Sequence, residues 1–167
     1  MNKSLLFEFS ADKENSTIHV KREFNAGVEI VWKAWTTAAL LDQWWAPKPY
    51  RTITRSMDFR PGGQWLYAMI SPENESHWCI LEYKEVSPLN SFSGLDAFCD
   101  EQGRIHTHFP RSLWHNVFTT TGDTTTVTIT ITYDKAEDLE TIIQMGFQEG
   151  FTMGLQNLDE LLPSLQK

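Results

Sequence analysis

The stretch that decides the fold is residues 125–163, TTVTITITYDKAEDLETIIQMGFQEGFTMGLQNLDELLP. Its first nine residues alternate between apolar residues and threonine, the period of two that predicts a half-buried β-strand. From Asp134 onward, apolar residues recur at intervals of three and four, which predicts one long amphipathic helix that ends near Pro163. Asp134 lies three residues before Glu137, a spacing close to that of a capping box. The sequence therefore passes directly from a strand to a long final helix.

Upstream of residue 125, turn signals divide the sequence into short segments with alternating polarity. The pair Gly122-Asp123 predicts a hairpin between strands at 114–121 and 125–133. Consecutive strands that are joined by short turns favour an antiparallel sheet. The other strands of this block are predicted at residues 51–60, 64–70, 78–86 and 91–99.

Two short helices are predicted before this block. The first begins after Asn25, a residue type that caps helices, and the second ends at Ala46-Pro47, because the residue before a proline is pushed away from helical geometry. A strand beginning at Thr17 precedes both helices, and residues 1–15 form an N-terminal extension or an edge strand. We therefore expect a single α+β domain over residues 16–163 with a tail at 164–167. In this domain a curved antiparallel sheet wraps around the long C-terminal helix, the only predicted element large enough to cover one sheet face.

Composition excludes several classes of protein. The formal charge of −8, without a basic block, argues against nucleic acid, whose phosphates bind clustered lysine and arginine. No apolar run approaches the ~20 residues that span a bilayer, so no membrane insertion is expected. Cys79 and Cys99 lack metal-ligand spacing and no nucleotide motif is present, so neither a metal nor a cofactor is expected. The N-terminus does not resemble a signal peptide, and we expect a cytoplasmic monomer or homodimer.

Three glycines in the final helix carry the main functional signal. Gly146, Gly150 and Gly154 fall within an arc of about 80° on the apolar face, at 100° per residue. Each glycine costs about 1 kcal/mol relative to alanine in a helix interior, so something must offset them. Two interpretations remain open: a close approach of the helix to the sheet, or a void that holds a small molecule.

Aromatic and polar residues on the expected inner face are consistent with a void that holds a small molecule. Large rings on a concave sheet can surround a cavity, although ordinary core packing is the common alternative. Arg22 and Glu82 share parity with apolar neighbours, which favours a buried ion pair of Arg22 with Glu82 or Asp58, or a pair of polar ligand anchors. No catalytic residue is assigned. The predicted ligand-binding residues are Trp65, Tyr67, Met69, Trp78, Phe118, Phe147, Gly150, Gly154, Arg22 and Glu82.

Several segments resemble one known family. The segments REFNA at 22–26, VWKAWT at 31–36 and LDQWWAP at 41–47 are similar to the opening signature of the activator of Hsp90 ATPase homologues. DFRPGGQW at 58–65, YKEVSP at 83–88 and the closing helix at 150–162 are similar to its later segments. The resemblance covers about residues 16–163.

This resemblance implies a START-like (Bet v 1-like, SRPBCC) helix-grip fold with a cavity between the sheet and the final helix. Members of the superfamily bind lipids, steroids, polyketides or other apolar ligands, and some catalyse cyclisation or hydrolysis. A chaperone partner is the less favoured expectation, because the co-chaperones that name the family carry an additional N-terminal domain. Residues 97–113 depart from the family pattern and are expected to form a loop over the cavity mouth.

We expect the chain to bind a small apolar or amphipathic ligand, which is lipid-like, aromatic or polyketide-like. One alternative is a cyclase-like or hydrolase-like enzyme in the same cavity, which predicts a buried histidine or carboxylate with a shifted pKa. Another is a co-chaperone-like interaction module, which predicts an exposed patch containing Trp44 or Trp45.

Overall fold

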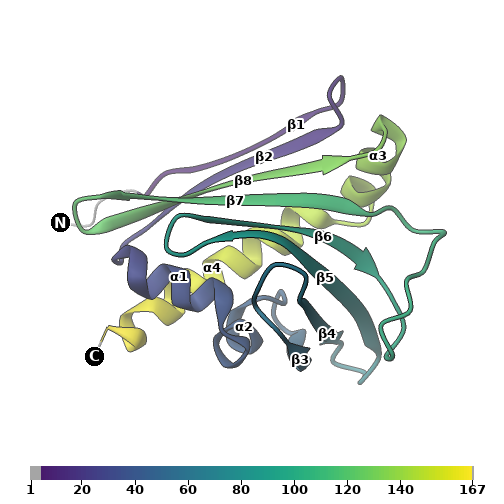
Figure 1. Ribbon diagram of the computed structural model, residues 1–167, viewed down its shortest axis with the longest axis horizontal. Helices are drawn as coiled ribbons and strands as arrows, with labels where there is room; N and C mark the ends of the chain where they lie inside the picture. The colour runs from purple at the N-terminus through teal and green to yellow at the C-terminus, as the bar shows by residue number, and fades with distance from the viewer. Residues whose placement is uncertain (1–4, 167) are drawn as a thin grey trace.

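The computed structural model describes residues 5–166 and contains one antiparallel sheet with four helices. The strand order across the sheet is β1-β2-β8-β7-β6-β5-β4-β3 (Figure 1). The strands are β1 (Phe7–Asp12), β2 (Thr17–Phe24), β3 (Arg51–Met57), β4 (Gln64–Ile70), β5 (Ser76–Ser87), β6 (Ser91–Phe98), β7 (Ser112–Thr121) and β8 (Thr124–Tyr133). The helices are α1 (Val28–Thr36), α2 (Ala38–Trp44), α3 (Ala136–Gln144) and α4 (Phe147–Leu165).

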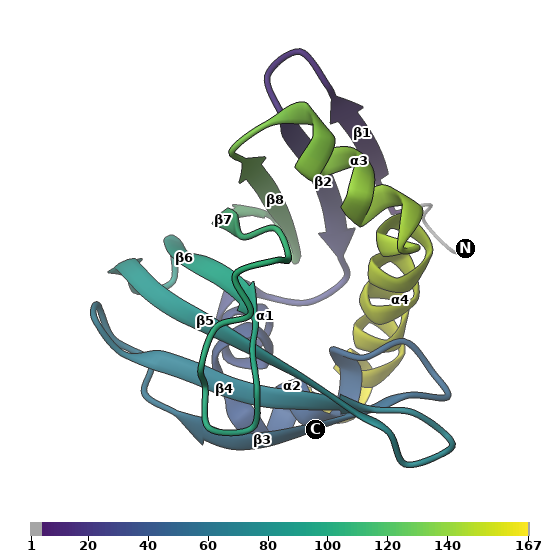
Figure 2. The same ribbon diagram turned by 90° about the vertical axis from the view of Figure 1, so that its right-hand side faces the viewer.

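The sheet curves around α4, so that its two ends approach the helix from opposite sides (Figure 2). Register shifts in β3 between Thr54 and Ser56 and in β5 between Tyr83 and Glu85 are irregularities of the kind that bend strands. The concave face of the sheet and the apolar stripe of α4 share one core. The predicted helix-grip fold is thus confirmed.

The prediction of one continuous final helix is wrong at Gly146. This residue has φ of 89° in the left-handed region, which ends α3 and lets α4 begin at Phe147. The apolar period continues through the break because both helices pack against the same core. At the other end, α4 extends past Pro163 to Leu165, because the fixed φ of proline, about −65°, is itself helical.

Tryptophans of α1 and α2 close one end of the core. Trp35 and Trp44 are buried with their rings edge to face, and Trp44 Nε1 donates to the Ala34 carbonyl at 3.0 Å. Trp32 is half-buried and packs edge to face on Phe118. The exposed patch that an interaction module would need at Trp44 or Trp45 is therefore not formed, because Trp44 is buried and Trp45 is half-buried.

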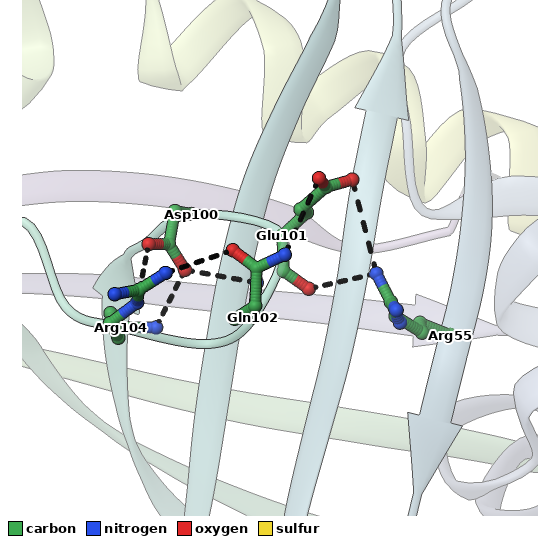
Figure 3. Close-up of polar contacts among 5 residues, drawn as sticks. All are labelled: Arg55, Asp100, Glu101, Gln102 and Arg104. Atoms are coloured by element: carbon green, nitrogen blue, oxygen red, sulfur yellow. Dashed lines mark hydrogen bonds and ion pairs between the residues drawn. The ribbon is translucent and has the colours of Figure 1, made fainter.

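Residues 99–105 cover the outer, convex face of the sheet. Asp100 Oδ1 accepts hydrogen bonds from the backbone N–H groups of Gln102 and Arg104, both at 2.9 Å, and Arg55 of β3 donates to the Glu101 carbonyl at 3.0 Å (Figure 3). Beneath this turn lies a second small core of Leu66, Ile80, Ala97 and Cys99. The expected loop over the cavity mouth is wrong for this central part, although Phe98 and Pro110 beside it do line the cavity.

Candidate functional site

A cavity of about 340 Å³ lies between the concave face of the sheet and the junction of α3 with α4. Its lining comes from strands β4 to β8, from both helices at the Gly146 break, and from residues 45–50 after α2. Most lining side chains are apolar or aromatic. The volume falls in the range of ~300–1,000 Å³ that is typical of small-molecule sites.

Four of the predicted residues line this cavity, namely Tyr67, Met69, Phe147 and Gly150. Trp65 lies next to Tyr67 on the same face of β4: its ring stacks on that of Tyr67 at 3.9 Å between centroids, and it borders an adjoining void of about 20 Å³. A void of that size holds about one water molecule. Trp65 therefore supports the cavity wall, and Tyr67 forms its surface.

The three glycines have different surroundings. A Cβ on Gly150 would meet only Pro47, at 3.7 Å, so this glycine leaves the cavity open beside it. A Cβ on Gly154 would lie 2.9 Å from the carbonyl oxygen of Trp45, so this glycine allows α4 to approach the chain that follows α2. Gly146 forms the turn between α3 and α4. The glycine pattern therefore combines open space beside Gly150 with a close approach at Gly154, although that approach is to the chain after α2 and not to the sheet, and Gly154 lies outside the cavity lining.

The predicted orientation of β5 is wrong for Trp78 and Glu82. Tyr67 pairs with Cys79 across β4 and β5, and Cys79, not Trp78, faces the cavity. Trp78 packs on the outer core, under the 99–105 turn. The inner face of β5 was predicted wrongly because this strand buries apolar side chains on both faces. An assignment from period-two alternation needs one polar face and one apolar face.

Glu82 and Arg22 form ion pairs away from the cavity. Glu82 accepts from Arg111 at 2.6 Å, and Arg22 lies 3.8 Å from Asp159 of α4. The expected pairing of Arg22 with Glu82 or Asp58 is therefore wrong. Phe118 is also outside the lining, because it belongs to the core under α1, where it packs against the ring of Trp35.

A polar row, missed by the sequence analysis, crosses the cavity wall. Asp96 of β6 pairs in register with Ser112 of β7, which in turn pairs with Tyr133 of β8, and all three line the cavity. Trp114 Nε1 donates to Ser112 Oγ at 3.0 Å. A signal was present, because Asp96 shares parity with Phe92 and is the one acidic residue in the apolar segment 91–98.

Asp96 carries the unusual electrostatics of the site. Removal from water raises the pKa of its carboxyl from 3.8 to about 7, while the Ala97 backbone N–H and the Arg111 charge oppose this rise. Its surface is only half-buried, because the side chain borders the open cavity. Burial also raises the pKa of Tyr67, Cys79 and Tyr133 well above their ordinary values, so these neighbours stay neutral at pH 7.

Hydrogen bonds hold the aromatic wall next to this row. Trp45 Nε1 donates to the phenol oxygen of Tyr67 at 3.1 Å, and the Trp45 ring lies 5.8 Å from that of Trp114 and 5.9 Å from that of Phe151. Among residues 5–166, no three His, Cys, Asp or Glu side chains lie close enough to hold a metal ion. The site is therefore a cavity with aromatic walls and one acidic side chain, that of Asp96, in its lining.

The sequence profile described as activator of Hsp90 ATPase homolog 1-like protein matches residues 25–163. The chain belongs to this family. The resemblance noted in the sequence is thus confirmed, and the family places the chain among ligand-binding or chaperone-related domains. Comparison with curated proteins finds no match. In the part of the chain that the structure describes, none of the helices is both long and apolar enough to cross a membrane.

Solved structures of bacterial proteins share the fold. A Mycobacterium smegmatis protein is 30% identical, with a TM-score of 0.87 over 95% of this chain and 97% of its own. A Nitrosomonas europaea protein is 25% identical, with a TM-score of 0.80 over 91% and 97%. An Arthrobacter aurescens protein is 22% identical, with a TM-score of 0.89 over 94% and 91%, and shows the likeness of fold alone.

Proposed function

We propose that this protein binds a small amphipathic molecule in the cavity between the sheet and α4. The observation that carries the proposal is the space of about 340 Å³, walled by aromatic side chains and crossed by one polar row. Such a cavity offers burial to an apolar ligand body, worth roughly 25 cal/mol per Å² of surface removed from water. The polar row would then fix the orientation of the ligand.

Gly150 supports the same proposal. Alanine would fit at this position, since its Cβ would be in ordinary contact with Pro47 at 3.7 Å, and it would favour the helix by about 1 kcal/mol. Packing therefore does not explain why the chain has glycine here. A requirement for open space beside α4 does.

Titration calorimetry with phenylbutanol, a phenyl ring joined to a hydroxyl by a short alkyl chain, tests the proposal. We expect saturable binding to the wild type and loss of binding in Gly150→Leu, whose side chain would occupy the cavity. Gln156→Leu is the control, because it adds the same side chain to an exposed position of α4. Equal binding by all three proteins, or no binding to the wild type by this probe, would contradict the proposal, provided that circular dichroism shows all of them folded.

Acid–base catalysis is a second candidate function, favoured by one observation. The carboxyl of Asp96 faces the cavity with a pKa of about 7, which suits a general acid or base near neutral pH. Phenylbutyl acetate, an ester of the same probe, allows a test by chromatography. Catalysis predicts release of phenylbutanol and acetate above the rate in buffer, abolished in Asp96→Asn, whereas pure binding predicts an unchanged ester.

A further inference from the structure

We propose that the cavity selects organic cations, namely molecules with a protonated amine on an apolar or aromatic body, and that the ammonium group binds beside Asp96. This inference rests on the proposed function, because it names the ligand class of the same cavity. It narrows the ligand from any amphipathic molecule to a basic one.

The first argument is the missing charge partner of Asp96. Among residues 5–166, no lysine, arginine or histidine nitrogen lies within ion-pair distance of its carboxylate, and no side chain donates a hydrogen bond to it. The charge of Arg111 lowers the pKa of Asp96, but the Arg111 guanidinium is held by Glu82 at 2.6 Å. A carboxylate removed from water without a cation is costly, and a ligand ammonium in contact with it would remove most of that cost.

The second argument is the aromatic wall around that carboxylate. Trp45, Tyr67 and Trp114 line the small void together with Asp96, and all four also line the larger cavity. The ring of Trp114 lies 5.4 Å from that of Phe151, so the wall continues toward α4. Ring faces carry negative potential and attract ammonium groups, by about 0.5–2 kcal/mol per contact.

The remaining groups near Asp96 do not offset this preference. Tyr67 of β4, Cys79 of β5 and Tyr133 of β8 stay neutral at pH 7 because burial raises their pKa values. His77 of β5 also lines the cavity. The chain as a whole carries a formal charge of −8, which adds a weak, salt-screened attraction for cations. An anionic head group would meet the Asp96 carboxylate, so fatty-acid-like ligands are disfavoured.

Three probes with one body and different head groups test the inference, namely phenylbutylamine, phenylbutanol and phenylbutyrate. Calorimetric titration at pH 8 keeps the amine protonated and Asp96 ionised. We expect the amine to bind at least about tenfold more tightly than the alcohol, as one added ion pair in a low-dielectric site would give, and the acid to bind most weakly. On Asp96→Asn the amine should bind no more tightly than the alcohol does on the same variant.

The control variant is Glu160→Gln, which removes one negative charge from an exposed position of α4 and should leave the ranking unchanged. If the alcohol binds and the amine binds no more tightly, or if Asp96→Asn weakens all three probes equally, the preference for cations is overturned while the proposed cavity function stands. If the wild type binds none of the three, both the cavity function and this inference are overturned.

Discussion

Gly150 and Gly154 lie one helical turn apart in α4 but face different neighbours. Gly150 borders open cavity, whereas Gly154 lies against the carbonyl oxygen of Trp45. The regular spacing of these glycines was visible in the sequence, and it indicated open space or a close approach, although the close approach found at Gly154 is to the chain after α2 and not to the sheet. It could not say which glycine served which purpose, because that depends on where residues 45–47 cross the helix.

Alanine at these two positions is expected to have opposite effects on stability. Gly154→Ala should lower the free energy of unfolding by about 1–3 kcal/mol, since the new Cβ would lie 2.9 Å from the backbone of Trp45 and force a shift. Gly150→Ala should leave it unchanged or raise it by up to about 1 kcal/mol through helix propensity. Urea unfolding followed by circular dichroism measures both, and equal effects of the two substitutions would refute this account of the helix.

Asp96 should make stability depend on pH. Well below its ordinary pKa of 3.8 the carboxyl is protonated in both the folded and the unfolded chain. Between its ordinary pKa of 3.8 and the folded pKa of about 7, the folded protein keeps a proton that the unfolded chain releases, so this group lowers the free energy of unfolding as pH rises and adds no further change above 7. Removing the titration with Asp96→Asn should remove this fall.

We therefore compare the free energies of unfolding of Asp96→Asn and the wild type. The value for Asp96→Asn minus the value for the wild type should increase by about 1–3 kcal/mol between pH 4 and pH 8. This range is smaller than the full pKa shift would give, because solvent reaches the cavity. Urea unfolding of both proteins at the two pH values measures the difference. A difference that does not change with pH would show that Asp96 titrates normally. Glu160→Gln, at an exposed position, should show no such trend.

At the scale of elements, Asn157 links α4 to the end of α2. This residue is buried, and its Nδ2 donates to the carbonyls of Ala46 at 3.0 Å and Trp44 at 3.4 Å. The link fixes the segment that carries Trp45 and Pro47 against the cavity. A polar residue within an apolar helical stripe was visible in the sequence, but its partners more than 100 residues away were not.

Asn157→Leu is expected to lower the free energy of unfolding by about 1–3 kcal/mol, because it leaves two carbonyl oxygens without their donor in a buried place. The neighbouring exposed substitution Gln156→Leu should change it by less than about 0.5 kcal/mol. Thermal unfolding by calorimetry compares the two. An Asn157→Leu protein as stable as the wild type would mean that these two hydrogen bonds contribute nothing to the stability of the fold.

Predictability differed among elements for physical reasons. Strand β8 was assigned correctly because its outer face carries threonines, so the polarity contrast along the strand is strong. Strand β5 was oriented wrongly because the 99–105 turn covers Trp78 and Ile80, which makes its outer face as apolar as its inner face. The break between α3 and α4 was missed for another reason. The apolar period continues across it, so the period alone could not reveal the left-handed conformation of Gly146 that separates the two helices.

At the scale of the whole molecule, the order of elements was enough to predict the wrapped sheet. Consecutive antiparallel strands followed by one amphipathic segment leave few ways to bury both apolar surfaces, and family membership agrees with the result. The polar wall of the cavity could not be predicted, because the register across β6, β7 and β8 brings Asp96, Ser112 and Tyr133 together. The fold therefore followed from local patterns, and the site from pairing between distant strands.

Diffraction from crystals soaked in bromobenzyl alcohol tests most directly whether the wrapped sheet encloses usable space. The bromine atom gives an anomalous signal that locates the probe without reference to any assumed binding mode. We predict a strong peak in the cavity beside Gly150, between Tyr67 and Phe147, and its loss from crystals of Gly150→Leu. An interior without bromine, filled by side chains that have closed over Gly150, would contradict the account.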